Sequence, residues 1–194
     1  MNVNKFKCLM LFIFLMLSAC SKNLNQTLLM HAAAKGDLPT VQQLINQGEN
    51  ITTKDNNGRN ALLYAIINDH LTVVQYLLQN GADANSTDKL GNTALIIAVT
   101  VGDAEIIKLL HAHGADINQA NQQGITPLIA AAAADTNQTV PLLLLSYGAN
   151  PCLKDKEHKN ALQTAEQWWG KEGVQEVLNK NKTLQVLICK DQHD

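Results

Sequence analysis

The sequence predicts an all-α solenoid of about five helix-turn-helix units, and three observations carry this prediction. A Thr or Asn recurs at a spacing of 33, 33, 33 and 34 residues, at Thr27, Asn60, Thr93, Thr126 and Asn160. A glycine recurs in register with it, at Gly48, Gly81, Gly114 and Gly148. The chain is 46% hydrophobic but only 4% aromatic, which suits tightly packed short helices better than a β-sandwich. A fixed period of this length is the signature of a repeat architecture.

Each unit supplies the same elements in the same order. An alanine-rich helix follows the Thr or Asn, and a second helix carries Val, Ile and Leu on one face. The glycine stands where the chain needs a positive φ to leave this second helix. One unit cannot bury its apolar face alone, so neighbouring units are expected to stack around a continuous core.

These units resemble the ankyrin repeat over nearly all of residues 27–180. The best matches are TPLIAAA, which begins at Thr126, and NGADAN and HGADIN, which begin at Asn80 and His113. The resemblance implies helix pairs joined by short β-turn or hairpin loops. It also implies a surface that binds a protein partner rather than a catalytic site.

Several positions depart from the ankyrin pattern. The histidine of its T-P-L-H opening is replaced in every unit, by Met30, Leu63, Ile96, Ile129 and Gln163. Apolar packing is therefore expected to substitute for the turn hydrogen bonds of that histidine. Pro141 in the fourth unit is tolerated only in the first turn of a helix, which makes residues 135–140 the expected irregularity. In the last unit Trp168, Trp169 and Gly170 stand where a turn would fall.

The N-terminus indicates export. Lys5 and Lys7 precede an apolar run over residues 9–17, which is too short to span a bilayer and is typical of a signal peptide. The sequence LSAC, ending at Cys20, resembles a bacterial lipobox, which implies lipidation of Cys20. The alternative is an ordinary secretory signal in which Cys20 is incidental. Ser21, where enteric lipoproteins retained in the inner membrane carry Asp, favours the inner leaflet of the outer membrane.

This interpretation divides the chain into four parts. They are a signal peptide (1–19), a lipid-anchored tether (20–26), the ankyrin-repeat domain (27–180) and a C-terminal tail (181–194). Residues 21–26, which separate Cys20 from the first unit, reach at most about 20 Å when extended, so the repeat domain is expected in the periplasm, close to the membrane.

Neither catalysis nor nucleic-acid binding is indicated. The formal charge is −2 and becomes −4 when Lys5 and Lys7 leave with the signal, whereas nucleic-acid binding depends on clustered basic residues. His111 and His113 are two residues apart and point to different sides of a helix, and no metal-ligand, phosphate-loop or nucleophile motif occurs. We expect no enzyme activity, no cofactor, no metal and no small-molecule substrate.

Two cysteines remain in the predicted mature domain and tail, Cys152 and Cys189. In an oxidising compartment they could pair and fasten the tail. The alternative, two independent buried thiols, stays open.

The ankyrin resemblance places the binding surface at the loop ends and the C-terminal ends of the first helices. The predicted partner-binding residues are Arg59, Ile67, Asn68, Lys89, Leu90, Val101, Ile125 and Trp168. Five of these are apolar at positions that should face solvent, and an apolar patch rimmed by polar groups marks an interface. The alternative is that some of them pack into the core, Trp168 above all.

Two functions fit these expectations. The first is an immunity protein, which occludes a toxic effector such as a phospholipase delivered by type VI secretion. The second is a periplasmic assembly or support factor for an exported enzyme such as a catalase. The sequence does not separate them.

Overall fold

The structure, a computed structural model, describes residues 27–134 and 139–180. Within these ranges the ordered elements are helices, without a strand. They are α2 (Leu28–Lys35), α3 (Leu38–Asn46), α4 (Ala61–Ile67), α5 (Leu71–Gln79), α6 (Ala94–Val101), α7 (Ala104–Ala112), α8 (Pro127–Ala133), α9 (Thr139–Ser146) and α10 (Ala161–Lys180). The all-α prediction is confirmed.

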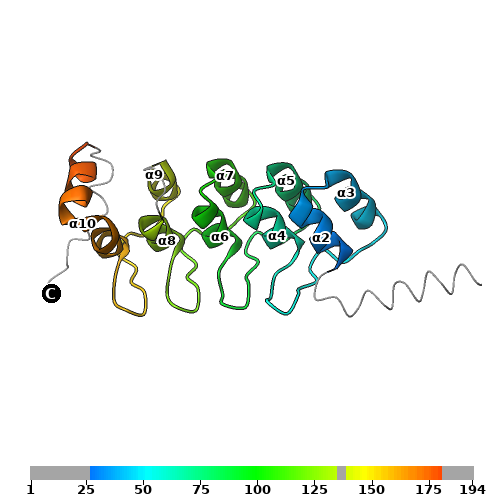
Figure 1. Cartoon of the computed structure of the whole chain (residues 1–194), viewed down its shortest axis with the longest axis horizontal. Coiled ribbons are helices and arrows are strands. Elements are labelled where there is room, and N and C mark those ends of the chain that lie inside the picture. Colours follow the sequence, from blue (N-terminus) through cyan, green and yellow to red (C-terminus); the bar gives the residue numbers. More distant parts are fainter. Residues whose placement is uncertain (1–26, 135–138, 181–194) are drawn as a thin grey trace, which may run out of the picture.

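The helices form two parallel rows. The first helices of the units, α2, α4, α6 and α8, lie side by side, and α3, α5, α7 and α9 form the second row (Figure 1). The loops that connect successive units project away from both rows on one side. The last unit contributes α10, which continues the first row beside α8 and is broken at Gly170 (φ 74°, ψ 154°).

Each first helix begins at one of the recurring Thr or Asn residues. Asn60 Oδ1 accepts from the Leu63 N–H (3.0 Å), and Thr93 Oγ1 accepts from the Ile96 N–H (3.1 Å). These bonds satisfy backbone donors that a helix start otherwise leaves unpaired, and such a cap stabilises a protein by about 1 kcal/mol. The 33-residue spacing is therefore a spacing of helix caps.

The residues that replace the ankyrin histidine are of two kinds. Leu63, Ile96 and Ile129 are buried and apolar, as expected. Gln163 instead returns a hydrogen bond, because its Oε1 accepts from the Asn160 N–H (3.0 Å). Met30 combines both behaviours: it is buried, and its Sδ lies 3.5 Å from the Thr27 backbone nitrogen.

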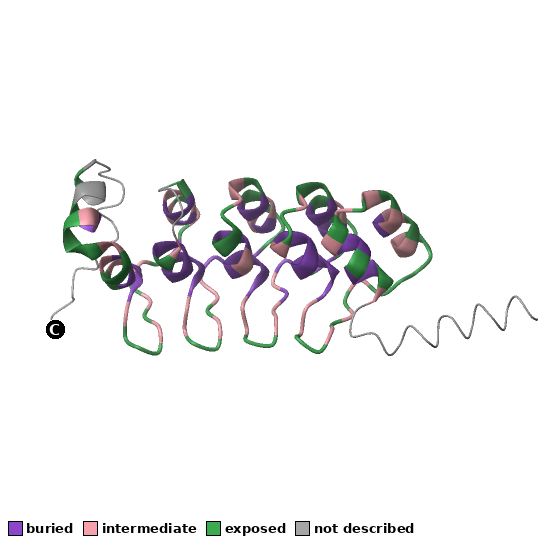
Figure 2. Cartoon of the chain, viewed as in Figure 1, coloured by how far each residue is buried: buried purple, intermediate pink, exposed green. Residues whose placement is uncertain are grey.

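The core runs without interruption along the described units. Leu62 and Ile66 of α4, Leu95 of α6 and Leu128 of α8 are all at most 1% exposed and belong to one cluster. Burial of each such side chain contributes about 1.5–3 kcal/mol. Buried positions gather on the helices and at the bases of the loops, whereas the loop ends are exposed (Figure 2). Because neighbouring units share this cluster, the fold depends on their stacking.

The two tryptophans of the fifth unit differ in burial. Trp169 packs against the core cluster, while Trp168 is 64% exposed. Gly170 makes the turn that was expected here.

In the fourth unit, Pro141 is the third residue of α9, where no intrahelical hydrogen bond from its nitrogen is needed.

Several sequence predictions fall outside the described residues. These are the signal peptide, Cys20, the tether, residues 135–138 and the tail with Cys189. None of the helices in the described ranges combines the length and the apolar character that a bilayer span requires.

Candidate functional site: the row of loop tips

The loops between units end in four tips with one common geometry. We call residues 55–59, 88–92, 121–125 and 155–159 tips 1 to 4. In tip 1 the Asp55 Oδ1 accepts from the N–H groups of Asn57 (2.9 Å) and Arg59 (2.8 Å), and the Asp55 N–H donates to the Arg59 carbonyl (2.9 Å). Asp88, Asn121 and Asp155 make the same three bonds in their tips. Each tip is thus closed by its own Asp or Asn.

Backbone hydrogen bonds join each tip to the next. The N–H of Lys89 donates to the Asn57 carbonyl (2.7 Å), and the N–H of Gln122 donates to the Leu90 carbonyl (3.2 Å). The bond from tip 4 to tip 3 runs from Lys156 to Gln123 (2.9 Å). The four tips therefore form one connected row, whose backbone is fixed before any partner arrives.

This stacking explains the glycines of the tips. Gly58, Gly91 and Gly124 have positive φ values of 74°, 76° and 78°. A Cβ at Gly58 would lie 2.7 Å from the Lys89 backbone nitrogen, and a Cβ at Gly124 would lie 2.9 Å from the Asp155 Cα. Tip 4 carries His158 at the same place, with φ 62°. No further tip follows it among the described residues, so a side chain is tolerated there.

A phenol ties tip 1 to its helix. Tyr64 of α4 donates from its hydroxyl to Asp55 Oδ2 (2.7 Å). Burial alone would raise the pKa of Asp55, but the hydrogen bonds from Tyr64, Arg59 and Asn57 together hold that pKa below its ordinary value. The carboxylate is consequently committed to holding the tip and is not presented to solvent as a free anion.

Three of the five predicted apolar contact residues are exposed. Leu90 at tip 2 is 64% exposed, Val101 at the end of α6 is 38% exposed, and Trp168 is exposed as well. Ile67 and Ile125 are half-buried, and Ile125 packs against the core. For Ile125 the core interpretation is therefore the better one, whereas the alternative that Trp168 packs into the core is wrong.

The predicted polar contacts also differ in access. Lys89 and Asn68 are exposed, but Arg59 is half-buried. The Nε of Arg59 is buried without a hydrogen-bond partner among the described residues. Asn68 ends α4, and its Nδ2 donates to the Tyr64 carbonyl (2.8 Å). Lys89 is thus the polar residue of the set that the row presents most openly.

The loops carry exposed cations although the whole chain is acidic. The exposed lysines are Lys54, Lys89, Lys154 and Lys156. The aspartates of the tips are used internally, as described above. These aspartates keep their negative charge, so Asp55 with Arg59 and Asp88 with Lys89 balance, and the tips carry no net excess of positive charge.

The C-terminal end of the row is hollowed. Tip 4 and α10 border an open, shallow depression of about 470 Å³, lined by Glu157, His158, Lys159, Gln163, Glu166, Gln167 and Lys171. Lys159 Nζ bridges its two sides, with bonds to Glu157 Oε2 (2.7 Å) and Gln167 Oε1 (2.6 Å). The depression is thus open to solvent and bordered mainly by polar and charged side chains.

Asparagines tie the closing turns of neighbouring units together. Asn85 Nδ2 donates to the Gly114 carbonyl (3.0 Å), and Asn85 Oδ1 accepts from the Asp116 N–H (2.8 Å). Asn118 makes the same two bonds to the next unit, at 3.4 and 2.7 Å. Each of these side chains bridges two units with a single carboxamide.

Cys152 stands in the same register as these asparagines, one unit later. It takes part in a disulfide. Its predicted partner, Cys189, lies outside the described residues, so the pairing of the two stays a prediction.

The described residues offer no arrangement for metal binding. No group of three or more His, Cys, Asp or Glu side chains in residues 27–134 and 139–180 could hold a metal ion. His111 stacks on Tyr147 instead, with ring centroids 3.9 Å apart and an interplanar angle of 18°. His113 lies with its Nδ1 2.9 Å from the Leu109 carbonyl. Both histidines therefore make contacts within the protein that account for their positions.

Comparison with known proteins gives one result. A family model described as ankyrin repeats (3 copies) matches residues 2–88, 29–121 and 95–189. No curated protein matches the chain.

Proposed function

The chain belongs to the ankyrin-repeat family, and from this premise we propose that it is an immunity protein of the bacterial periplasm. It binds a toxic secreted effector, such as a phospholipase delivered by type VI secretion, and covers the entrance to the effector's active site. Ankyrin repeats are protein-binding modules and are generally not catalytic, and this supports inhibition by occlusion.

The observation that carries the proposal is the way in which Leu90 is presented. Its side chain is 64% exposed, yet the backbone around it is hydrogen-bonded to the tips on either side of tip 2. The preceding N–H, that of Lys89, is bonded to tip 1, and the Leu90 carbonyl is bonded to tip 3. A large apolar side chain on a preorganised backbone loses little conformational freedom on binding, so it suits an interface anchor.

The exposed lysine beside Leu90 favours an acidic group on the partner surface. Lys89 is its neighbour in tip 2, and exposed lysines occur on the first and last loops as well. Complementary charge around an apolar contact mainly raises the association rate and the specificity. We therefore expect an apolar patch on the partner, with an acidic group placed to meet Lys89.

The N-terminal sequence supports the proposed location. A lipidated Cys20, separated from the first unit by the six residues 21–26, would hold the row of tips beside the membrane that a phospholipase attacks. Tethering raises the effective concentration of the inhibitor where the toxin arrives. Several acyl chains give a stable anchor where one chain gives only reversible binding.

The proposal is tested with a candidate toxin expressed in the periplasm of cells that carry the wild-type chain or a variant. The variant is Leu90→Glu with Val101→Glu, which places two charges on the proposed contact. The matched control is Leu71→Glu, because Leu71 is 36% exposed, close to the exposure of Val101, but lies at the start of α5 in the second row. Circular dichroism of the purified chains checks that each variant is folded, and immunoblotting checks that the cells contain equal amounts.

We expect the double variant to lose more than about 2 kcal/mol of toxin binding, or about 30-fold in affinity, and to lose protection. Leu71→Glu should retain both. Equal protection by all three chains would exclude Leu90 and Val101 from the inhibitory surface. If the envelope partner proves to be an exported enzyme, such as a catalase, whose assembly needs the chain, the support-factor function replaces the immunity function.

A further inference from the structure

Asn85 bridges the second and third units, and Asn118 bridges the third and fourth. Among the described residues, no carboxamide makes the corresponding bridge between the first and second units. Thr52 stands 33 residues before Asn85, in the same register. Its N–H and its hydroxyl both donate to Asn50 Oδ1, at 2.9 and 2.8 Å. Thr52 is thus committed to its own turn and forms no bond to the second unit.

The groups that the bridge would reach are present but unmatched. By the register of the repeat, the Gly81 carbonyl and the Asp83 N–H correspond to the Gly114 carbonyl and the Asp116 N–H, which Asn85 binds. In the part of the chain that the structure describes, neither the Gly81 carbonyl nor the Asp83 N–H has a hydrogen-bond partner within the protein, and both residues are exposed to solvent. An unmatched donor and an unmatched acceptor therefore lie two residues apart in one turn.

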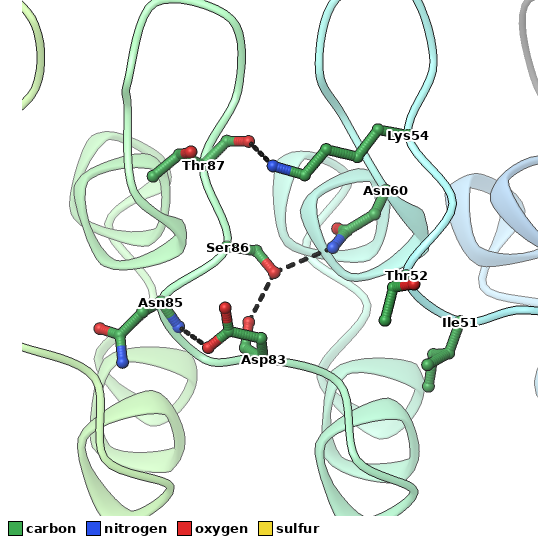
Figure 3. A pocket seen from close by; sticks show the side chains of 8 residues that line it. All are labelled: Ile51, Thr52, Lys54, Asn60, Asp83, Asn85, Ser86 and Thr87. Atoms are coloured by element: carbon green, nitrogen blue, oxygen red, sulfur yellow. Dashed lines mark hydrogen bonds between the residues drawn. The ribbon is translucent and has the colours of Figure 1, made fainter.

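A pocket lies at this interface. It has a volume of about 200 Å³ and is lined by Ile51, Thr52, Lys54, Asn60, Asp83, Asn85, Ser86 and Thr87 (Figure 3). Thr52 and Asp83 correspond to Asn85 and Asp116, the two ends of one bond of the bridge in the next interface. The pocket thus occurs where the sequence lacks the carboxamide.

The walls of the pocket are held in place by the protein itself. Lys54 Nζ donates to the Thr87 carbonyl (2.8 Å), and Asn60 Nδ2 donates to Ser86 Oγ (2.9 Å). Ser86 Oγ in turn donates to the Asp83 carbonyl (2.6 Å). The Lys54 bond joins the first unit to the second, and the other two bonds lie within the second unit. Together they hold the walls of the pocket in place.

We propose that this pocket is a second recognition site, which binds the primary carboxamide of an Asn or Gln side chain presented by a protein partner. The carboxamide oxygen accepts from the Asp83 N–H, and the NH₂ donates to the Gly81 carbonyl, as Asn85 does with the matching groups of the next unit. Asp83 lines the pocket, whereas Gly81 is not among the lining residues. Ile51, which packs against the core, offers an apolar wall to the side-chain methylene groups. The proposal does not depend on the immunity function, because it concerns the base of the loops and not the row of tips.

Other ligand chemistries fit less well. A carboxylate has no donor for the Gly81 carbonyl, and the nearby Asp83 side chain repels it. An ammonium group has no acceptor for the Asp83 N–H. A trans peptide group directs its N–H and its carbonyl to opposite sides, so it cannot make both bonds from one end. The pair of groups therefore selects a side-chain amide over a backbone amide.

The test uses the full chain labelled with ¹⁵N and three probes: acetamide, acetate and N-methylacetamide. We expect acetamide to cause a saturable shift of the Asp83 amide resonance, with little effect from the other two. Thr52→Asn should abolish this shift, because its side chain fills the site, whereas Thr52→Ser should keep it. The Asp116 amide, which Asn85 already binds, is the internal control and should not respond.

Three results would overturn the proposal. They are the absence of a saturable Asp83 shift with acetamide, an equal shift with acetate, and an undiminished shift in a folded Thr52→Asn variant. An equal shift with N-methylacetamide would show that backbone amides bind as well and would refute the side-chain selectivity. None of these outcomes bears on toxin protection, so the two proposals fail or succeed separately.

Discussion

Replacing Gly58 by Ala measures what the stacking of the tips contributes to stability. Gly58 has φ 74°, which costs an L-residue about 1–2 kcal/mol, offset in part by about 0.4–1 kcal/mol because Ala has fewer unfolded conformations. In addition, the new Cβ would lie 2.7 Å from the Lys89 backbone nitrogen. A backbone atom cannot move aside as a flexible side chain does, and such overpacking costs about 1–3 kcal/mol. We expect Gly58→Ala to destabilise the chain by about 2–4 kcal/mol.

Two controls separate the conformation from the contact. Gly48 has φ 84°, and a Cβ added there would meet nothing within 4 Å, so Gly48→Ala should cost only about 1 kcal/mol. His158 occupies the place of Gly58 in tip 4, with φ 62° and no following tip in the described part of the chain. His158→Gly should therefore leave stability unchanged or raise it by up to about 1 kcal/mol.

The measurement is urea unfolding followed by circular dichroism, with the slopes of the three variants compared. Equal slopes would show that each substitution changes stability and not the extent of unfolding. If Gly58→Ala costs no more than Gly48→Ala, the stacking of tip 2 on tip 1 does not constrain this glycine, and the reasoning is refuted.

Three further predictions concern separate parts of the chain. Cys20→Ser should release the protein from the membrane fraction and abolish lipid labelling; a variant that stays membrane-bound at the mature size would exclude the lipobox. Burial raises the pKa of Asp69, and the neighbouring Asp103 carboxylate raises it further. The folded state therefore holds this proton more tightly, so stability falls as the pH rises from the ordinary pKa of 3.8 through the raised pKa, and the loss stays constant at higher pH. Asp69→Gly, which also relieves φ 59°, should stabilise the chain by about 1 kcal/mol, more at pH 7 than at pH 3, in paired thermal melts; the same gain at both pH values would assign it to φ alone. Peptide mapping of non-reduced protein should find Cys152 linked to Cys189, and Cys152→Ser should cost about 3–4 kcal/mol; an alkylatable Cys189 thiol in the native protein would contradict this.

The periodic features of the fold were predictable because each depends on residues within one unit. A helix cap needs only a Thr or Asn and the N–H three residues later, so Thr27, Asn60, Thr93, Thr126 and Asn160 were found from their spacing. The turn at Gly170 followed in the same way from its place in the last unit. Local chemistry repeated at a fixed period leaves a signal that one sequence can show.

The features that depend on a neighbouring unit were harder to predict. Ile125 occupies an outward position in the pattern, but it packs against the core. The half-buried Arg59 and the exposed Trp168 likewise depend on what the adjacent elements cover. The exchange of Asn for Thr at residue 52 did leave a sequence signal, because the same register reads Thr52, Asn85, Asn118 and Cys152. Its meaning needed the bonds that the asparagines make across the interfaces.

His158 also has a consequence for how such an array could lengthen by gene duplication. A unit duplicated between the existing ones would place its loop against Gly58, Gly91 or Gly124, none of which has a side chain to displace. A unit added after tip 4 would bring its backbone against the Cβ of His158, at the distance of less than 3 Å that separates the Gly58 and Gly124 positions from the tips that follow them. The array can therefore gain units internally, whereas growth at its C-terminal end first requires the loss of one histidine.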